Sequence, residues 1–202
     1  MNKPRELARR SKLGYLVLAV ALGGAAFAAG CRGEGTTAGC PSAEPAGPPI
    51  GEAVMAFLSA ARALHHEADV RQGTGDTRGA VASLERLVAL PAPRAVEVDE
   101  VVADARARLA ELRLAQGDVD GADREVQAGL ERVKGPTYFR GHLLEVEGLL
   151  EEARAGALAD AGKNEEAVRA RAKAVDLLEE AVKVQEQVIE HALADGGKDG
   201  ER

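Results

Sequence analysis

A short pattern of glycine, a helix-capping side chain and alanine occurs three times in this chain and constrains its fold more than any other feature. In each copy the glycine favours the end of one helix, and Asp76, Asp118 or Asn164 can cap the next. The alanine five residues after the glycine is small enough for close contact between two helices. The copies are Gly75-Asp76-Thr77-Arg78-Gly79-Ala80, Gly117-Asp118-Val119-Asp120-Gly121-Ala122 and Gly162-Lys163-Asn164-Glu165-Glu166-Ala167, at intervals of 42 and 45 residues.

Apolar residues between Val54 and Ile189 recur at steps of three and four, which is the spacing of one buried helical face. No stretch shows the sustained alternation of a strand. The pattern predicts an all-α fold of six helices, with breaks near residues 73–75, 91–93, 117, 135–136 and 162. A helix–turn–helix unit repeated at this period is typical of an α-solenoid of about three stacked hairpins. A plain helical bundle is the alternative.

Small residues occur in a characteristic order between Leu109 and Leu130. Leu109 and Ala110 form a large–small pair in one helix, and Ala122 and Gly129 are small positions in the next. These residues resemble the tetratricopeptide repeat family. The resemblance covers residues 52–193, and the outer units match mainly at Ala68, Ala80, Leu84, Ala155, Ala167 and Ala174.

The chain also departs from the tetratricopeptide pattern. Its units exceed the usual 34 residues, and Arg106 and Arg113 occupy positions where the family has large aromatic side chains. The resemblance implies a concave surface, lined by the first helix of each unit, that holds a peptide or helix of a partner protein. In the middle unit the family's groove positions correspond to Asp104, Ala107, Glu111 and Leu114.

The first 31 residues have the composition of an export signal. Five basic residues lie between Lys3 and Lys12, an uncharged apolar run extends from Leu13 to Ala29, and Cys31 follows Gly30. This order resembles the lipobox of bacterial lipoproteins. The resemblance implies cleavage before Cys31, a diacylglycerol on its thiol, and attachment to a membrane through that lipid.

Two other interpretations of this segment remain open. Ala26-Phe27-Ala28 is itself a cleavage site for ordinary secretion, and the 17-residue apolar run could be a retained anchor although it is short for a membrane span. We predict a signal peptide over residues 1–30, a lipidated N-terminus and disordered tether over 31–49, a helical domain over 50–193 and a disordered tail over 194–202.

Charge and aromatic content limit the class of ligand. Residues 1–30 hold five basic and one acidic residue, so the remaining 172 residues keep 21 basic and 32 acidic residues, a net charge near −11. This balance argues against binding nucleic acid or an anionic membrane surface by charge, and it favours a basic partner segment. The same 172 residues contain only three aromatic side chains and no Trp, too few for a typical small-molecule pocket.

The sequence contains no recognisable catalytic or cofactor-binding motif. Adjacent helical side chains point about 100° apart, so His65 and His66 are poorly placed to chelate one metal ion. We interpret the four histidines as solvated or rim residues. We therefore expect no catalytic residue, no metal site and no cofactor.

These observations predict a lipid-anchored envelope protein that acts as a protein-docking module. Arg32 follows Cys31 where aspartate retains many similar lipoproteins on the inner membrane, so the outer membrane facing the periplasm is favoured. The alternative is a structural periplasmic bundle that self-associates through its long last helix. Val175, Leu178, Val182 and Ile189 approximate a coiled-coil seam there, but Gln185 interrupts it.

Overall fold

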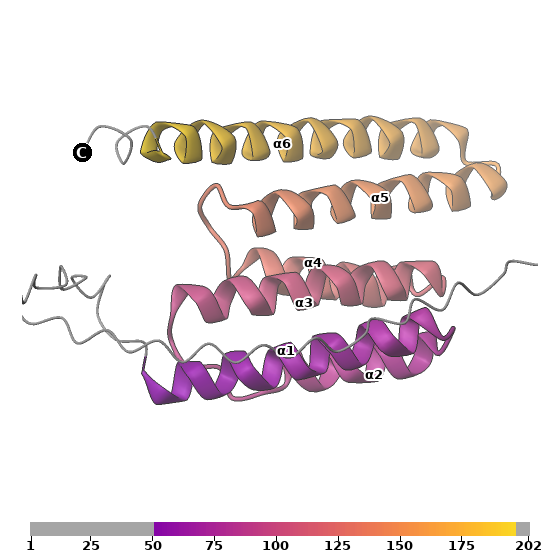
Figure 1. Ribbon diagram of the computed structural model, residues 1–202. Helices are drawn as coiled ribbons and strands as arrows, with labels where there is room; N and C mark the ends of the chain where they lie inside the picture. The colour runs from indigo at the N-terminus through magenta and orange to yellow at the C-terminus, as the bar shows by residue number, and fades with distance from the viewer. Residues whose placement is uncertain (1–50, 197–202) are drawn as a thin grey trace, which may run out of the picture. The chain divides into compact units, whose positions relative to one another are not determined.

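The computed structural model describes residues 51–196, and within this range the chain forms six α-helices and no strand (Figure 1). The all-α prediction is confirmed, and each predicted break falls between two helices. The helices are α1 (Glu52–Gly73), α2 (Thr77–Val88), α3 (Val96–Ala115), α4 (Val119–Leu130), α5 (Tyr138–Asp160) and α6 (Asn164–Gly196).

The three predicted glycines end α1, α3 and α5 through one hydrogen-bonded turn. Gly75, Gly117 and Gly162 have φ of +83°, +81° and +75°, in the left-handed region that favours glycine. After α3, the amide of Asp118 donates to the carbonyl of Arg113 over 2.9 Å, and the amide of Gly117 donates to that of Leu114. The same pair of bonds follows α1 and α5, so each turn satisfies carbonyls that the helix end would leave unpaired.

Two of the three predicted caps are confirmed. The carboxylates of Asp76 and Asp118 each accept a hydrogen bond of 2.9 Å, from the amides of Gly79 and Gly121 respectively. The prediction for Asn164 is wrong, because α6 already begins at this residue. Lys163 occupies the position equivalent to the two aspartates, and an ammonium group cannot accept a bond from the helix N-terminus.

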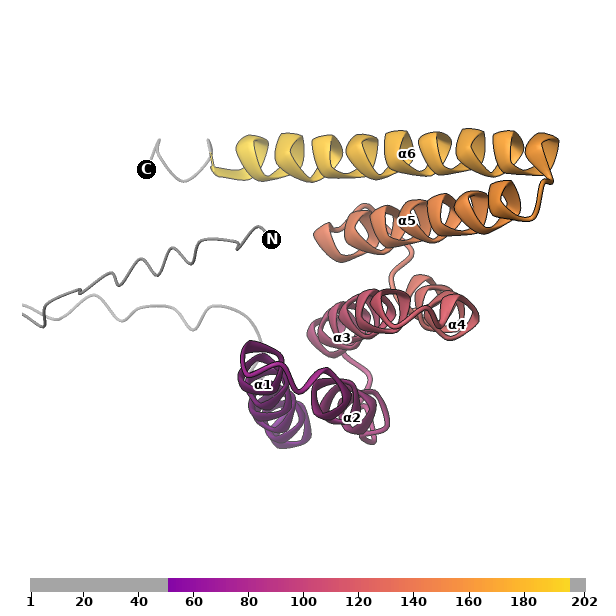
Figure 2. The same ribbon diagram turned by 90° about the vertical axis from the view of Figure 1, so that its right-hand side faces the viewer.

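The helices pack as three consecutive antiparallel hairpins. α1 packs on α2, α3 on α4 and α5 on α6, while α2 contacts α3 and α4 contacts α5. The first helices also meet, α1 with α3 and α3 with α5. Figure 2 shows α1 and α2 nearly end-on and α6 nearly side-on, so successive hairpins are rotated relative to each other.

Small and branched aliphatic residues form the core. One cluster joins α1, α2 and α3 around Leu84, Leu87 and Leu109, and a second joins α3, α4 and α5 around Val126 and Leu143. The three predicted contact alanines, Ala80, Ala122 and Ala167, each expose at most 1% of their surface. The repeated glycine–alanine pattern therefore fixes both the turn and the helix contact that follows it.

Charged groups fill the positions where the tetratricopeptide family has aromatic side chains. Arg106 Nη1 on α3 lies 2.6 Å from Glu125 Oε2 on α4, and Arg113 Nη2 lies 3.6 Å from Glu125 Oε1 and 2.8 Å from Glu85 Oε1 on α2. All but Glu85 are mostly buried. A carboxylate with two guanidinium partners is tolerated there because its charge is compensated. These ion pairs link the second hairpin internally and to the first.

One end of the predicted domain differs in the structure. α6 continues through Gly196, three residues beyond the predicted end of the domain, so residues 194–196 are helical rather than part of a tail. The predicted signal peptide, Cys31 and the tether lie outside the described residues. The described residues, 51–196, contain both core clusters, as expected of an independent domain.

We expect that Ala122→Leu destabilises the helical domain by about 1–3 kcal/mol, because the larger side chain overpacks the contact between α3 and α4. Ala82→Leu is the matched control: Ala82 is exposed on α2, where the same change should stay within about 0.5 kcal/mol. Urea denaturation of residues 47–202 measures both. Equal midpoints for the two variants would contradict close packing at Ala122.

Candidate functional site

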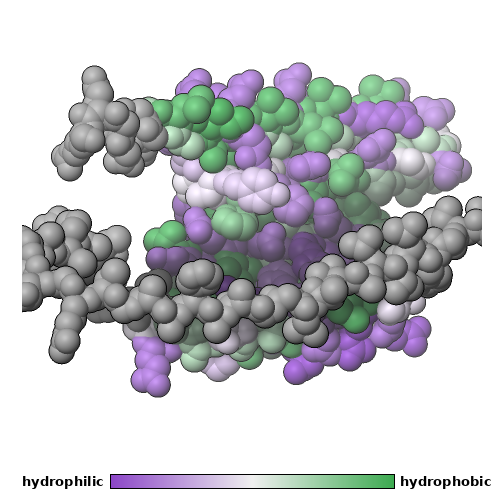
Figure 3. All heavy atoms as spheres, in the orientation of Figure 1, coloured by the Kyte–Doolittle hydropathy of each residue, from purple (hydrophilic) through white to green (hydrophobic). Residues whose placement is uncertain are grey.

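The surface formed by α1, α3 and α5 carries charged side chains that reach from one helix to the next. We refer to this surface as the first-helix surface. Figure 1 shows these three helices, and Figure 3, in the same orientation, shows hydrophilic residues over the region between α1 and α5. Two predicted groove residues, Asp104 and Glu111, lie on α3 within this surface and contact α1 and α5 respectively.

At the junction of α1 and α3, Arg108 and Asp104 bind the same histidine. Arg108 Nη1 lies 3.0 Å from His65 Nδ1, and Asp104 Oδ2 lies 3.7 Å from His65 Nε2. Arg108 Nη2 also binds Asp69 Oδ1 on α1, at 2.5 Å. Because the guanidinium can only donate, His65 Nδ1 accepts, and the neutral ring carries its proton on Nε2, toward Asp104.

Burial lowers the pKa of His65, because a charged imidazolium loses solvation there. The negative charges of Asp104 and Asp69 oppose this effect, and the positive charge of Arg108 adds to it. His65 is therefore neutral near pH 7.

At the junction of α3 and α5, a second histidine has the opposite behaviour. His142 Nε2 lies 3.3 Å from Glu111 Oε1, and this hydrogen bond raises the pKa of His142 above its ordinary value. Burial opposes the shift, while Glu111, Asp104 and Glu145 add to it by charge. The raised pKa means that the folded protein binds this proton more tightly than the unfolded chain, so its contribution to stability is lost as pH rises.

Two of the predicted groove residues are not available as expected. Ala107 has no exposed surface and packs in the second core cluster with Ala103, Ala110 and Ala122. It cannot contact a docked partner, so its assignment to the groove is corrected. Leu114 is partly buried against the same cluster and offers only an edge to the surface.

The sequence interpretation missed the histidines and their partners. His65 and His142 are not solvated rim residues, because less than a fifth of each side chain is exposed and both have charged partners on α3. The spacing of Asp104, Arg108 and Glu111 places them on one helical face. This polar face was a signal in the sequence, but the partners on α1 and α5 depend on how the helices pack.

No protein-family model matches this chain, and no curated protein matches its sequence. Within residues 51–196, no helix is both long and apolar enough to span a membrane. In the same range, no cluster of three or more His, Cys, Asp or Glu side chains is arranged to hold a metal ion.

We expect that Glu111→Gln lowers the pKa of His142, because the variant removes a negative charge and its charge-assisted hydrogen bond. Titration of the histidine ring resonances by NMR measures the shift. His65 is an internal control, since its pKa depends on Asp104, Arg108 and Asp69 rather than on Glu111. Glu131→Gln, an exposed change next to α4, should leave both values unchanged. An unchanged His142 in Glu111→Gln would show that the pair does not form in solution.

Proposed function

We propose that this protein is a lipid-anchored bacterial envelope protein that docks a basic segment of a partner protein on its first-helix surface. The observation that carries the proposal is the cluster of acidic side chains from three separate helices. Asp69 on α1 binds Arg108, Asp104 on α3 faces His65, and Asp104, Glu111 on α3 and Glu145 on α5 all act by charge on His142.

The charges of this surface are only partly compensated. Arg108 contributes one positive charge and His142, whose pKa is raised, adds to it, against four carboxylates, while burial keeps His65 neutral near pH 7. Glu111 and Asp69 keep about half of their side-chain surface exposed, so they can accept bonds from an incoming Lys or Arg. Such complementarity favours fast encounter and selection of basic partners, and both weaken as salt screens the charges.

The helical framework supports docking by holding these groups in place. Their helices carry buried leucines and valines in two shared core clusters, so the acidic side chains project from rigid elements rather than loops. Stacked helical hairpins commonly bind partners along an extended surface of this kind. The tetratricopeptide resemblance at Leu109, Ala110, Ala122 and Gly129 agrees with the same role. We infer that the protein acts by binding rather than by catalysis.

The proposed localisation in the cell envelope is based on the export signal and Cys31. We expect Cys31→Ala to abolish lipid attachment. Cells fed a clickable fatty acid should label the wild-type protein and not the variant. Cys40→Ser is the matched control and should retain the label, because Cys40 lies beyond the lipobox. Equal labelling of wild type and Cys31→Ala would exclude Cys31 as the lipidated residue.

The docking site is tested by photocrosslinking in intact envelopes. We expect a photoreactive amino acid at Glu111 to yield a crosslinked partner, and one at Glu131 to yield none, since Glu131 is exposed but lies at the end of α4. Mass spectrometry of the crosslinked peptide should locate a Lys- or Arg-rich segment, and higher salt should reduce the yield. Products at neither position, or stronger ones at Glu131, would refute docking at the first-helix surface.

A further inference from the structure

α6 has one face packed on α5 and a second face that is apolar yet exposed. Ala174, Ala181 and Val184 are buried on the packed face. On the other face, four β-branched residues follow one another at intervals of seven and each leave more than half of their surface exposed: Val168, Val175, Val182 and Ile189. We refer to these four residues as the α6 stripe. Figure 3 shows apolar patches along this helix, and exposed Leu193 extends them.

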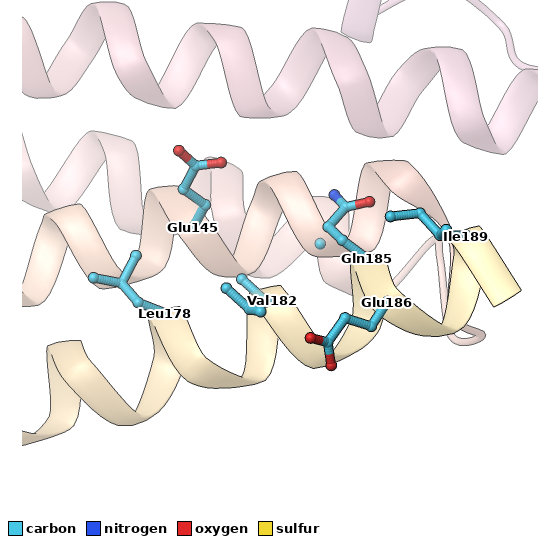
Figure 4. A pocket seen from close by; sticks show the side chains of 8 residues that line it. Glu145, Leu178, Val182, Gln185, Glu186 and Ile189 are labelled. Carbon is cyan, nitrogen blue, oxygen red and sulfur yellow. The ribbon is translucent and has the colours of Figure 1, made fainter.

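Gln185 does not interrupt the α6 stripe. Its Nε2 donates a hydrogen bond of 3.1 Å to the carbonyl of Tyr138, so its side chain is engaged by α5. It lies over Gly141, where an added Cβ would be only 2.4 Å from Nε2. Figure 4 shows Gln185 beside Val182 and Ile189 at the groove of about 430 Å³ between α5 and α6. The sequence predicted that Gln185 would interrupt an apolar seam on α6. It does not lie in the stripe, because its side chain is bound to α5 of its own chain.

We propose that the α6 stripe binds the α6 stripe of a second copy of this chain in an antiparallel, two-fold symmetric contact. One apolar side chain every seven residues keeps the same side of a helix facing a partner, as the a positions of a coiled coil do, and Leu178 adds an apolar residue at the intermediate position in the centre. From Val168 to Ile189 the stripe is about 32 Å long at 1.5 Å per residue. A ridge of this length and regularity is complementary to itself.

The charges beside the stripe favour the antiparallel orientation. Arg171 lies between Val168 and Val175 near the start of α6, while Glu186 lies between Val182 and Ile189 in its second half. A parallel pair would place Arg171 and Glu186 each at the same level along the contact as its own copy, so that neither would meet an opposite charge. Like charges across a helix contact are unfavourable, and opposite charges set its orientation.

A two-fold axis crossing α6 between Leu178 and Glu179 aligns the stripe with its own copy, although it also brings Glu179 close to Glu179 of the second copy. It places Val168 opposite Ile189 of the second copy, and Val175 opposite its Val182. The same axis places Arg171 opposite Glu186 of the second copy. Leu178, which is partly exposed, lies beside the axis in the centre of the contact.

The contact is modest in size, so the dimer should be reversible. Two single helices meeting over about 32 Å bury less than the roughly 1,600 Å² of a standard protein interface. This surface is separate from Asp104 and Glu111 on the first-helix surface, so the two proposals can fail independently.

Sedimentation velocity of residues 47–202, which contain no cysteine, tests self-association. We expect a monomer–dimer equilibrium with increasing concentration, and Val182→Glu should weaken it by on the order of tenfold or more, because it places two carboxylates near the axis without partners. Val70→Glu makes the same change at an exposed position on α1 and should dimerise like the wild type. A wild-type protein that stays monomeric, or equal dimerisation by both variants, would overturn the proposal.

Disulfide trapping tests the orientation. Equal amounts of Val168→Cys and Ile189→Cys proteins are mixed and oxidised, and the expected product is the mixed dimer, because the antiparallel contact brings these positions together. The Val168→Cys protein alone should form no dimer, since its two thiols would lie about 32 Å apart along the helices. Dimers of Val168→Cys alone would indicate parallel pairing and refute the antiparallel contact.

In intact envelopes, a photoreactive residue at Val182 tests which molecule covers the stripe. Capture of a different protein and not of a second copy would assign the stripe to another occupant.

Discussion

The rest of this structure depends on the packing of paired helices at a buried alanine. In each pair, a glycine ends the first helix and the alanine lies in the second, five residues after the glycine. At Gly75, Gly117 and Gly162 the chain reverses in the same left-handed turn, and the next helix begins two residues later. Ala80, Ala122 and Ala167 then enter the helix contact with almost no exposed surface. With so few aromatic residues available, closely packed small side chains supply the interior density that larger ones provide elsewhere.

Two mostly buried carboxylates are compensated by positive charges between the paired helices of a hairpin. Glu125 lies between Arg106 and Arg113, and Glu151 lies between Arg154 on its own helix and Lys173 on α6. Both carboxylates are mostly buried, and hydrogen bonds to Lys173 and Arg154 lower the pKa of Glu151 against the opposing effect of its burial. Such pairs contribute little net stability compared with apolar packing, but removing one partner leaves a costly unpaired charge. They therefore fix how the helices of a hairpin align.

The same framework presents two surfaces of contrasting chemistry. The first-helix surface is acidic and polar, with Asp104 and Glu111 held by histidines of the neighbouring helices. The α6 stripe is apolar and lies on the last helix described, which packs on α5 by its opposite face. An acidic surface suits a basic polypeptide, whereas an apolar repeat of seven suits another helix. The two proposed contacts lie on different helices, so they would not compete with each other.

The sequence by itself determined the helices, the three glycine turns, the caps at Asp76 and Asp118, and the alanines of the helix contacts. These features depend on hydrogen bonds and periodicities within a few residues, which local sequence encodes directly. The packing of whole helices decided the rest: it buried Ala107, gave His65 and His142 their partners on α3, and turned Gln185 toward Tyr138. Those outcomes join residues up to 47 positions apart, so they follow from the rotation of each helix about its axis. Only the tertiary structure fixes that rotation, because every core contact contributes to it at once.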